Sequence, residues 1–252
     1  MTVNPSGLRI EPSAEILSAA RAWLNSVRPA LAPDFLAAYL TGSVLNQGFD
    51  VEQSAINVLV VSRSLASDRL DALAKAMPAP AKKAPRFDPL FMTQSNIEKS
   101  LDSFPIEWIE IQERHLLIEG EDIVAGLNVS HTDLRLQCER ELRGKFIQLR
   151  QTYLLHHGKP AQLHQALAAA ASGFATLFRT LLRLRGEIVP ATPGQVIERV
   201  ADVFGLEAQG LLAAHLARYG GKNSPNEALA HYRAFLIQIE RLTTAIDQLR
   251  VP

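Results

Sequence analysis

Short, nearly continuous runs of apolar residues mark the first half of the chain, and such runs predict buried strands. The run over 56–61 is rich in β-branched residues and gives the strongest strand signal of the chain. Strands are predicted at four places: 35–40, 56–61, 106–111 and 115–118. Apolar residues at helical spacing predict helices over 13–27 and 65–77. The proline- and alanine-rich stretch over 78–85 predicts an extended, solvated loop.

The second half of the chain changes to long helical periods, separated by glycine and proline. Helices are predicted at five places: 134–155, 161–184, 194–204, 207–219 and 226–249. Strands followed by helices predict an α/β (α+β) fold, with a mixed sheet flanked by helices and then an all-α helical bundle. The change in pattern predicts a sheet domain over 1–130 and a helical bundle domain over 131–252.

Composition and charge narrow the class of protein. Lys plus Arg and Asp plus Glu both number 26, so the bulk charge does not indicate a nucleic-acid partner or an anionic membrane surface. The single cysteine, Cys138, cannot form an internal disulfide, which favours a reducing cytoplasm. No signal-peptide pattern stands at the N-terminus, and the apolar stretch Ala166–Phe178 is too short to span a bilayer. We therefore expect a soluble, cytoplasmic protein with no membrane partner.

A glycine-serine turn between the first two predicted strands carries the most specific signal. Leu40-Thr41-Gly42-Ser43 is followed, after a gap of about a dozen residues, by Ser54-Ala55-Ile56-Asn57 at the start of the second strand. This layout resembles the signature of the nucleotidyltransferase superfamily, and in particular the aminoglycoside adenylyltransferases. The helical second half resembles the domain that follows the catalytic domain in many bacterial relatives. The resemblance implies the same fold over most of residues 36 to 250.

The chemistry that the resemblance implies needs two carboxylates at positions i and i+2 of the second strand. Such residues point to the same face and can hold Mg²⁺ together. Here Ala55 and Asn57 stand at these positions, and neither supplies a carboxylate. The resemblance implies a third carboxylate on a neighbouring strand, which we assign to Glu107 in the predicted strand over 106–111. It also implies nucleotide contacts from Gly42, Ser43 and Asn57.

The loss of both paired acids predicts a protein that has lost metal-dependent catalysis and serves as a nucleotide- or partner-binding regulatory module. The expected partners are a nucleoside triphosphate or a protein, with no cofactor and no metal. One alternative is an active Mg²⁺-dependent adenylyltransferase in which Glu107 works with Asp50 or Glu52. Another is a helical-bundle ribonuclease that uses Arg150 and His156.

The helical half adds weaker signals. Opposite charges at i, i+4 predict a solvated helix face carrying Arg135, Glu139 and Arg143, with Cys138 and Leu142 turned inward. His156 and His157 are expected to end a helix, where positive charge is favourable. The resemblance places three arginines where they could meet phosphate: Arg135, Arg143 and Arg183. The sequence identifies no acceptor substrate and leaves the oligomeric state open, although we expect the helix at 166–178 to pack within the bundle.

Overall fold

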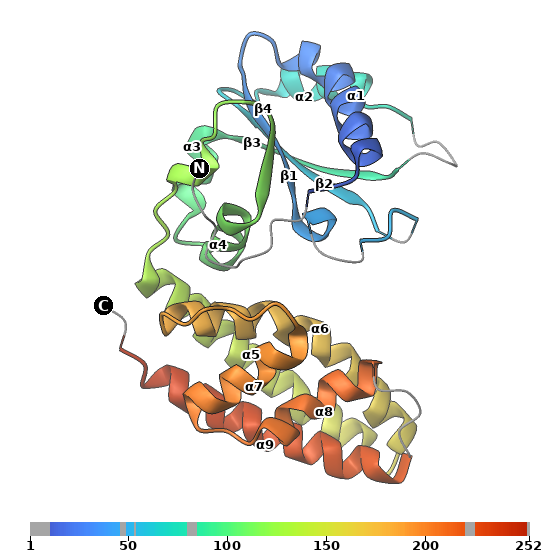
Figure 1. Cartoon of the computed structure of the whole chain (residues 1–252), viewed down its shortest axis with the longest axis vertical. Helices are drawn as coiled ribbons and strands as arrows, with labels where there is room; N and C mark the ends of the chain where they lie inside the picture. The colour runs from blue at the N-terminus through green and yellow to red at the C-terminus, as the bar shows by residue number, and fades with distance from the viewer. Residues whose placement is uncertain (1–10, 46–48, 53, 80–84, 220–224, 251–252) are drawn as a thin grey trace. The chain divides into compact units, whose positions relative to one another are not determined.

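The structure is a computed structural model that describes residues 11–45, 49–52, 54–79, 85–219 and 225–250. The chain folds into two compact units, which meet in the sequence between Val129 and Ser130. The first is a sheet unit and the second is a helical unit, and each is described by itself (Figure 1). The predicted loop over 78–85 lies largely outside the described residues.

The sheet unit is built on a four-stranded mixed sheet with the order β3-β2-β1-β4. Its strands are β1 (Phe35–Thr41), β2 (Ile56–Ser62), β3 (Phe87–Thr93) and β4 (His115–Gly120). Strand β1 pairs antiparallel with both β2 and β4, whereas β2 and β3 run parallel. The central strands β1 and β2 are almost wholly buried, as their apolar runs predicted.

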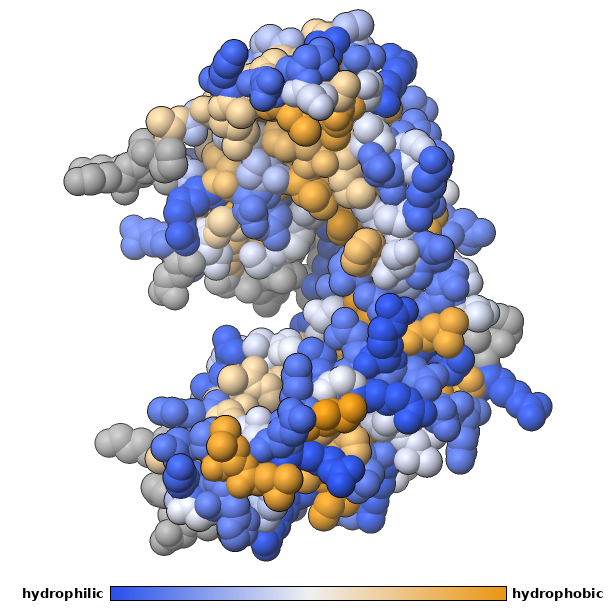
Figure 2. All heavy atoms as spheres, turned by 180° about the vertical axis from the view of Figure 1, so that it is seen from behind, coloured by the Kyte–Doolittle hydropathy of each residue, from blue (hydrophilic) through white to orange (hydrophobic). Residues whose placement is uncertain are grey.

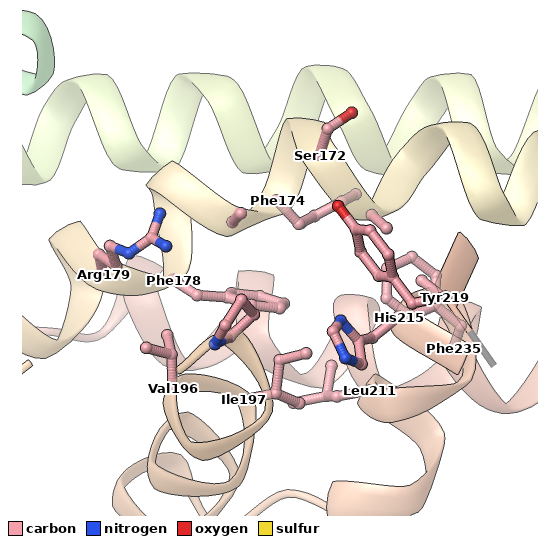
Figure 3. A pocket seen from close by; sticks show the side chains of 14 residues that line it. Ser172, Phe174, Phe178, Arg179, Val196, Ile197, Leu211, His215, Tyr219 and Phe235 are labelled. Carbon is pink, nitrogen blue, oxygen red and sulfur yellow. The ribbon is translucent and has the colours of Figure 1, made fainter. Parts of the chain in front are cut away.

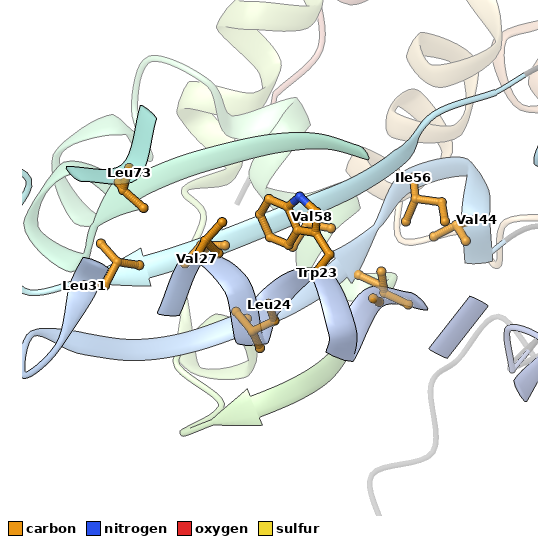
Figure 4. Packing of buried hydrophobic residues seen from close by; sticks show 12 residues of the cluster. Trp23, Leu24, Val27, Leu31, Val44, Ile56, Val58 and Leu73 are labelled. Atoms are coloured by element: carbon orange, nitrogen blue, oxygen red, sulfur yellow. The ribbon is translucent and has the colours of Figure 1, made fainter. Parts of the chain in front are cut away.

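Helices cover both faces of this sheet (Figure 1). On one face lie α1 (Ala14–Leu31) and α2 (Ser67–Ala76), and on the other lie α3 (Gln94–Ser100) and α4 (Pro105–Glu113). The first core joins Trp23 and Leu24 of α1 to Val58 of β2, with the side chains directed toward one another (Figure 4). The second core joins Leu59 of β2 to Trp108 of α4. Alternate residues of β2 therefore pack into the two cores, because successive side chains of a strand point to opposite faces of the sheet.

The structure overturns the prediction of a strand over 106–111. This segment is helix α4, which begins with Pro105 in its first turn and buries Ile106 and Trp108. Proline at the first helical position is preorganised for a helix, and this signal outweighs the β-favouring isoleucines that suggested a strand. The sequence prediction also missed β3, an edge strand with Pro89 in its middle, and the short helix α3 that follows it. Proline occurs in edge strands because one side of such a strand forms no ladder hydrogen bonds.

The end of β4 depends on a glycine. Gly120 has a φ of 96°, and a Cβ atom added there would lie 2.0 Å from the carbonyl oxygen of Leu36. We expect Gly120→Ala to lower the free energy of unfolding of the sheet unit by about 3 kcal/mol, because both the backbone strain and the clash must be relieved. Denaturant titration measures this change. The matched control is Gly126→Ala, since an added Cβ atom meets nothing within 4 Å there, and its cost should stay below about 0.5 kcal/mol. Equal costs for the two variants would contradict this role for Gly120.

The helical unit confirms the predicted bundle. Its helices are α5 (His131–His156), α6 (Pro160–Leu184), α7 (Pro193–Phe204), α8 (Ala208–Tyr219) and α9 (Pro225–Asp247). Each begins or ends within a few residues of its prediction because proline and glycine mark the boundaries. Gly205, for example, ends α7 in the left-handed conformation with a φ of 64°. Helix α6 packs against α5, α8 and α9, which makes it central to the unit.

The charged face of α5 also matches its prediction. Glu139 accepts hydrogen bonds from Arg135 and Arg143, each at 2.9 Å, and Arg143 reaches Asp247 of α9 at 2.7 Å. The two arginines hold the pKa of the Glu139 carboxyl below its usual range, chiefly through the hydrogen bond from Arg143. Cys138, on the neighbouring face of the helix, is fully buried, and burial raises the pKa of its thiol to about 12. This cysteine is thus a packing residue with little thiolate character.

By length and composition, helix α6 could cross a membrane. In the structure it carries buried residues along its length, among them Leu167, Phe174 and Leu181, as a core helix does. The expectation that this segment packs within the bundle is confirmed. On the face seen in Figure 2, hydrophobic and hydrophilic side chains of the helical unit are interspersed. Mixing of this kind is ordinary for a protein surface and does not by itself mark an interface.

Candidate functional site

The candidate site begins where β1 ends. Thr41 closes the strand, and the chain then turns through a short 3-10 helix, Gly42–Leu45. Gly42 has a φ of 73°, and a Cβ atom added there would lie 2.7 Å from Nδ2 of Asn57. The turn and the start of β2 are thus in close contact, and only glycine fits between them. Ser43 is exposed beside this contact.

Four polar residues form a row across the sheet at this level. Thr41 of β1 pairs with Asn57 of β2 on one side and with His115 of β4 on the other. Asn57 pairs in turn with Asp88 of β3. Residues paired across neighbouring strands point to the same face, so these four side chains share the face that α3 and α4 cover. Asn57 is half-buried and Asp88 is exposed, so the row opens to solvent toward β3.

Asp88 is the carboxylate that the sequence reasoning missed. The assignment of a third carboxylate to Glu107 assumed a strand over 106–111, and that strand prediction is wrong. Glu107 lies exposed in the first turn of α4, about 9 Å along the helix axis from Glu113, the last residue of the helix before β4. Asp88 instead occupies the strand position beside Asn57. The sequence gives little signal for it, because the exposed positions 88 and 90 hold Asp and Leu and because Pro89 argues against a strand.

Few metal-binding groups meet at this row. Asp88 is its only carboxylate, Asn57 contributes a neutral amide, and Ala55 contributes no ligand. Asp50 and Glu52 lie in the loop before β2, as expected, and the Asp50 carboxylate accepts a hydrogen bond from the backbone N–H of Glu52 at 2.9 Å. Within the described residues, no group of three or more His, Cys, Asp or Glu side chains is arranged to hold a metal ion.

The fourth member of the row, His115, has a structural role and is held by hydrogen bonds through both ring nitrogens. Its Nδ1 lies 3.0 Å from the carbonyl oxygens of Ile111 and Gln112, and its Nε2 lies 3.1 Å from the Asp122 carboxylate. The ring also meets the edge of Tyr39 at 5.5 Å between centroids. With both nitrogens engaged, His115 fixes the end of α4 to the start of β4. It thereby supports Thr41 and the turn that follows.

Tyr39 of the central strand β1 holds the segment that follows β4 in place. Its hydroxyl donates to the carbonyl oxygen of Glu121 at 2.9 Å and accepts from the backbone N–H of Ile123 at 2.8 Å. Burial raises the pKa of Tyr39 above its ordinary value, which keeps the hydroxyl neutral and able to donate. The segment that contains Asp122 is therefore anchored to β1, which fixes the carboxylate that His115 contacts.

The candidates in the helical unit do not form a site together. Arg150 and His156 are six residues apart on α5, which places them on different sides of the helix. Arg150 lies over the ring of Phe146 at 5.4 Å, and His156 is the last residue of α5 with His157 as its cap. Arg135 and Arg143 are both paired with Glu139. Arg183 donates to the hydroxyl of Thr180 at 3.4 Å.

Comparison with solved structures shows which fold this is. The chain superposes on a spectinomycin adenyltransferase, AAD(9), from Enterococcus faecialis, whose structure contains ATP and spectinomycin. The TM-score is 0.52 at 14% identity, and the match covers 91% of this chain and 100% of the other. A nucleotidyltransferase-like protein from Exiguobacterium sibiricum 255-15 gives a TM-score of 0.40 at 15% identity, covering 91% of this chain and 74% of the other. No family model matches the chain, and no curated protein matches it. The chain thus has a nucleotidyltransferase-like sheet fold followed by a helical region.

Proposed function

We propose that the sheet unit binds a nucleoside triphosphate at the Gly42–Ser43 turn and does not catalyse metal-dependent nucleotidyl transfer, so that the chain works as a nucleotide-binding regulatory module. The observation that carries the proposal is the pair formed by Asn57 and Asp88. At the place where this fold would need a cluster of carboxylates, the row holds one carboxylate and one amide.

The absence of two paired carboxylates argues against metal-dependent nucleotidyl transfer. Mg²⁺ prefers carboxylate and water ligands in octahedral geometry, and a neutral amide oxygen is a weaker ligand. Phosphoryl and nucleotidyl transfer depend on the metal to neutralise charge that develops on the phosphates. Losing a stabilising group of this kind lowers a rate by about 10²–10³-fold, and here two groups are absent. We infer that the residues present do not make a two-carboxylate magnesium site.

The turn itself still suits a phosphate. Gly42 and Ser43 are both exposed, so an anion can approach the turn on the side away from Asn57, and the Ser43 hydroxyl can donate a hydrogen bond. The similar spectinomycin adenyltransferase was solved with ATP, which makes ATP the first nucleotide to test. A cytoplasmic location and a protein partner remain predictions.

The alternative is an active Mg²⁺-dependent nucleotidyltransferase, and one observation favours it. Asp88 lies exposed and in register with Asn57, so a metal held by one carboxylate and bridged by nucleotide phosphates would sit at this end of the row. The earlier alternative that paired Glu107 with Asp50 or Glu52 loses its strand argument, because Glu107 belongs to helix α4.

Thermal unfolding with ATP, GTP, CTP and UTP, each with and without Mg²⁺, tests the proposal. A nucleotide at a hundred times its Kd adds about 2.7 kcal/mol of stability, which raises Tm by several degrees. We expect a shift without added metal that Ser43→Ala diminishes. The matched control is Ser64→Ala, an exposed serine beyond the other end of β2, which should leave the shift unchanged.

Two outcomes would count against the proposal. A shift that requires Mg²⁺ and disappears in Asp88→Asn would support the active enzyme instead. The absence of any shift with all four nucleotides at millimolar concentration would exclude binding with a Kd of about 10 μM or tighter, and the protein-partner hypothesis would take its place.

A further inference from the structure

The helical unit contains a cavity that the proposed function does not use. It lies among α6, α7, α8 and α9 and has a volume of about 190 Å³. All of its lining residues belong to the helical unit, so it is separate from the row of polar residues on the sheet. Figure 3 shows side chains from several of these helices directed into one space.

The floor of the cavity is apolar and aromatic. Phe174 and Phe178 of α6 and Phe235 of α9 are each at most 3% exposed. The rings of Phe174 and Phe235 meet edge to face at 5.2 Å between centroids, which fixes their orientation. Val196 and Ile197 of α7 close the floor on another side. A planar apolar group would therefore be surrounded by rigid aromatic and branched side chains.

The polar groups lie toward the mouth, and the charged ones have one sign. His215 and Tyr219 of α8 stand on one side of the cavity and Arg179 of α6 stands on the other (Figure 3). Next to this mouth, Arg218 donates a hydrogen bond from its guanidinium to the hydroxyl of Ser172 at 3.1 Å. No Asp or Glu is among the lining residues described by the structure. Such a mouth attracts an anion and disfavours a cation.

The volume limits the apolar part of an occupant. A cavity of about 150 Å³ lined by Leu, Ile and Phe holds one benzene molecule, so about 190 Å³ admits one aromatic ring with a short side chain. A nucleotide or a fused multi-ring molecule exceeds this space. The half-buried imidazole of His215 lies between the apolar floor and the exposed Tyr219, where a short acid side chain would end.

We propose that this cavity is a binding site for a small aromatic monocarboxylate, with its ring among Phe174, Phe178 and Phe235 and its carboxylate at His215 and the nearby Arg218. The ring gains apolar burial and edge contacts. The carboxylate accepts hydrogen bonds from the partly desolvated imidazole and from the guanidinium. Because the acceptor is charged, these hydrogen bonds are stronger than those to a neutral acceptor. The site is independent of nucleotide binding by the sheet unit.

Isothermal titration calorimetry on the full chain tests the proposal with three probes of one shape and different charge: phenylacetate, phenylacetamide and phenethylamine. We expect phenylacetate to bind at least tenfold more tightly than the neutral amide, and phenethylamine to bind more weakly than both. Binding of all three with equal affinity, or failure of phenylacetate to bind at millimolar concentration, would overturn the proposal. The measurement needs no nucleotide, so its result is separate from that of the proposed function.

Variants locate the site. His215→Leu should reduce the preference for phenylacetate over phenylacetamide and leave the affinity for the amide almost unchanged. The matched control is His231→Leu, a half-buried histidine of α9 outside the lining, which should keep the full preference. Ala175→Leu should fill the cavity and weaken all three probes. Ala175 is only half-buried, so this variant should fold. If Ala175→Leu folds and binds phenylacetate as the parent does, the probe lies elsewhere and the assignment of the cavity is wrong.

Discussion

Replacing Phe235 with alanine is expected to lower the free energy of unfolding of the helical unit by about 3–5 kcal/mol, the largest stability effect we predict for a single substitution. Phe235 is fully buried on α9 and meets Phe174 of α6 edge to face. Its removal deletes the transfer free energy of a whole ring and enlarges a cavity that is already present. The surrounding helices cannot collapse far, because Phe174 and Leu211 are themselves packed against other elements.

Chemical denaturation followed by circular dichroism at 222 nm measures this change, since most of the helical signal comes from the helical unit. The control is Ile237→Ala, two residues further along α9, where the side chain is 47% exposed. Its cost should stay below about 1 kcal/mol because little apolar area leaves the interior. A cost for Phe235→Ala near that of the control would mean that the cavity relaxes, and the site argued for it would then lack a rigid floor.

The sequence allowed the buried parts of the fold to be predicted where burial was uniform. Strand β2 is buried on both faces from Val58 to Val61, so this stretch is apolar throughout and marks a strand without ambiguity. The long helices α5 and α6 were predictable because many turns repeat the same spacing and prolines mark their ends. Local pattern and tertiary environment agree in these elements.

The edges of the sheet unit were not predictable in the same way. Strand β3 is paired on one side only, so Asp88 and Leu90 are exposed and its pattern resembles that of a loop. Helix α4 contains isoleucines that favour strands, and its packing against the second core decides its conformation. The site follows the same division. Motif spacing predicts a site at the Gly42–Ser43 turn and Asn57, whereas Asp88 joins this candidate site only through its register with Asn57.

Placing carboxylates at positions 55 and 57 is expected to create a magnesium site, with the largest change in ligand affinity that we predict. In Ala55→Asp/Asn57→Asp the new side chains stand at i and i+2 where the chain enters β2, a spacing that favours one face, and position 57 pairs with Asp88. Aspartate has nearly the shape of asparagine, so an oxygen can replace Nδ2 of Asn57 beside Gly42 without a new clash. Each carboxylate contributes about 8 kcal/mol of attraction to the dication at 4 Å in a partly exposed site, before desolvation is subtracted. We expect the affinity for Mg²⁺ to rise by at least about 100-fold, which corresponds to 2.8 kcal/mol.

The control for this variant carries the same added charge in a different arrangement. In Ser54→Asp/Asn57→Asp the carboxylates stand at i and i+3, and position 54 lies in the bend before β2, so the pair lacks the i, i+2 spacing of a shared metal site. Without metal, the new aspartates repel Asp88, and the designed variant should unfold at a lower temperature than the parent. Added Mg²⁺ should restore its Tm, whereas the control should recover much less. Equal recovery in both variants would mean that the ion responds only to net charge. No recovery in either would mean that the row of Thr41, Asn57 and Asp88 is not a position from which this fold can hold a metal, and the lost-enzyme interpretation would lose its structural basis.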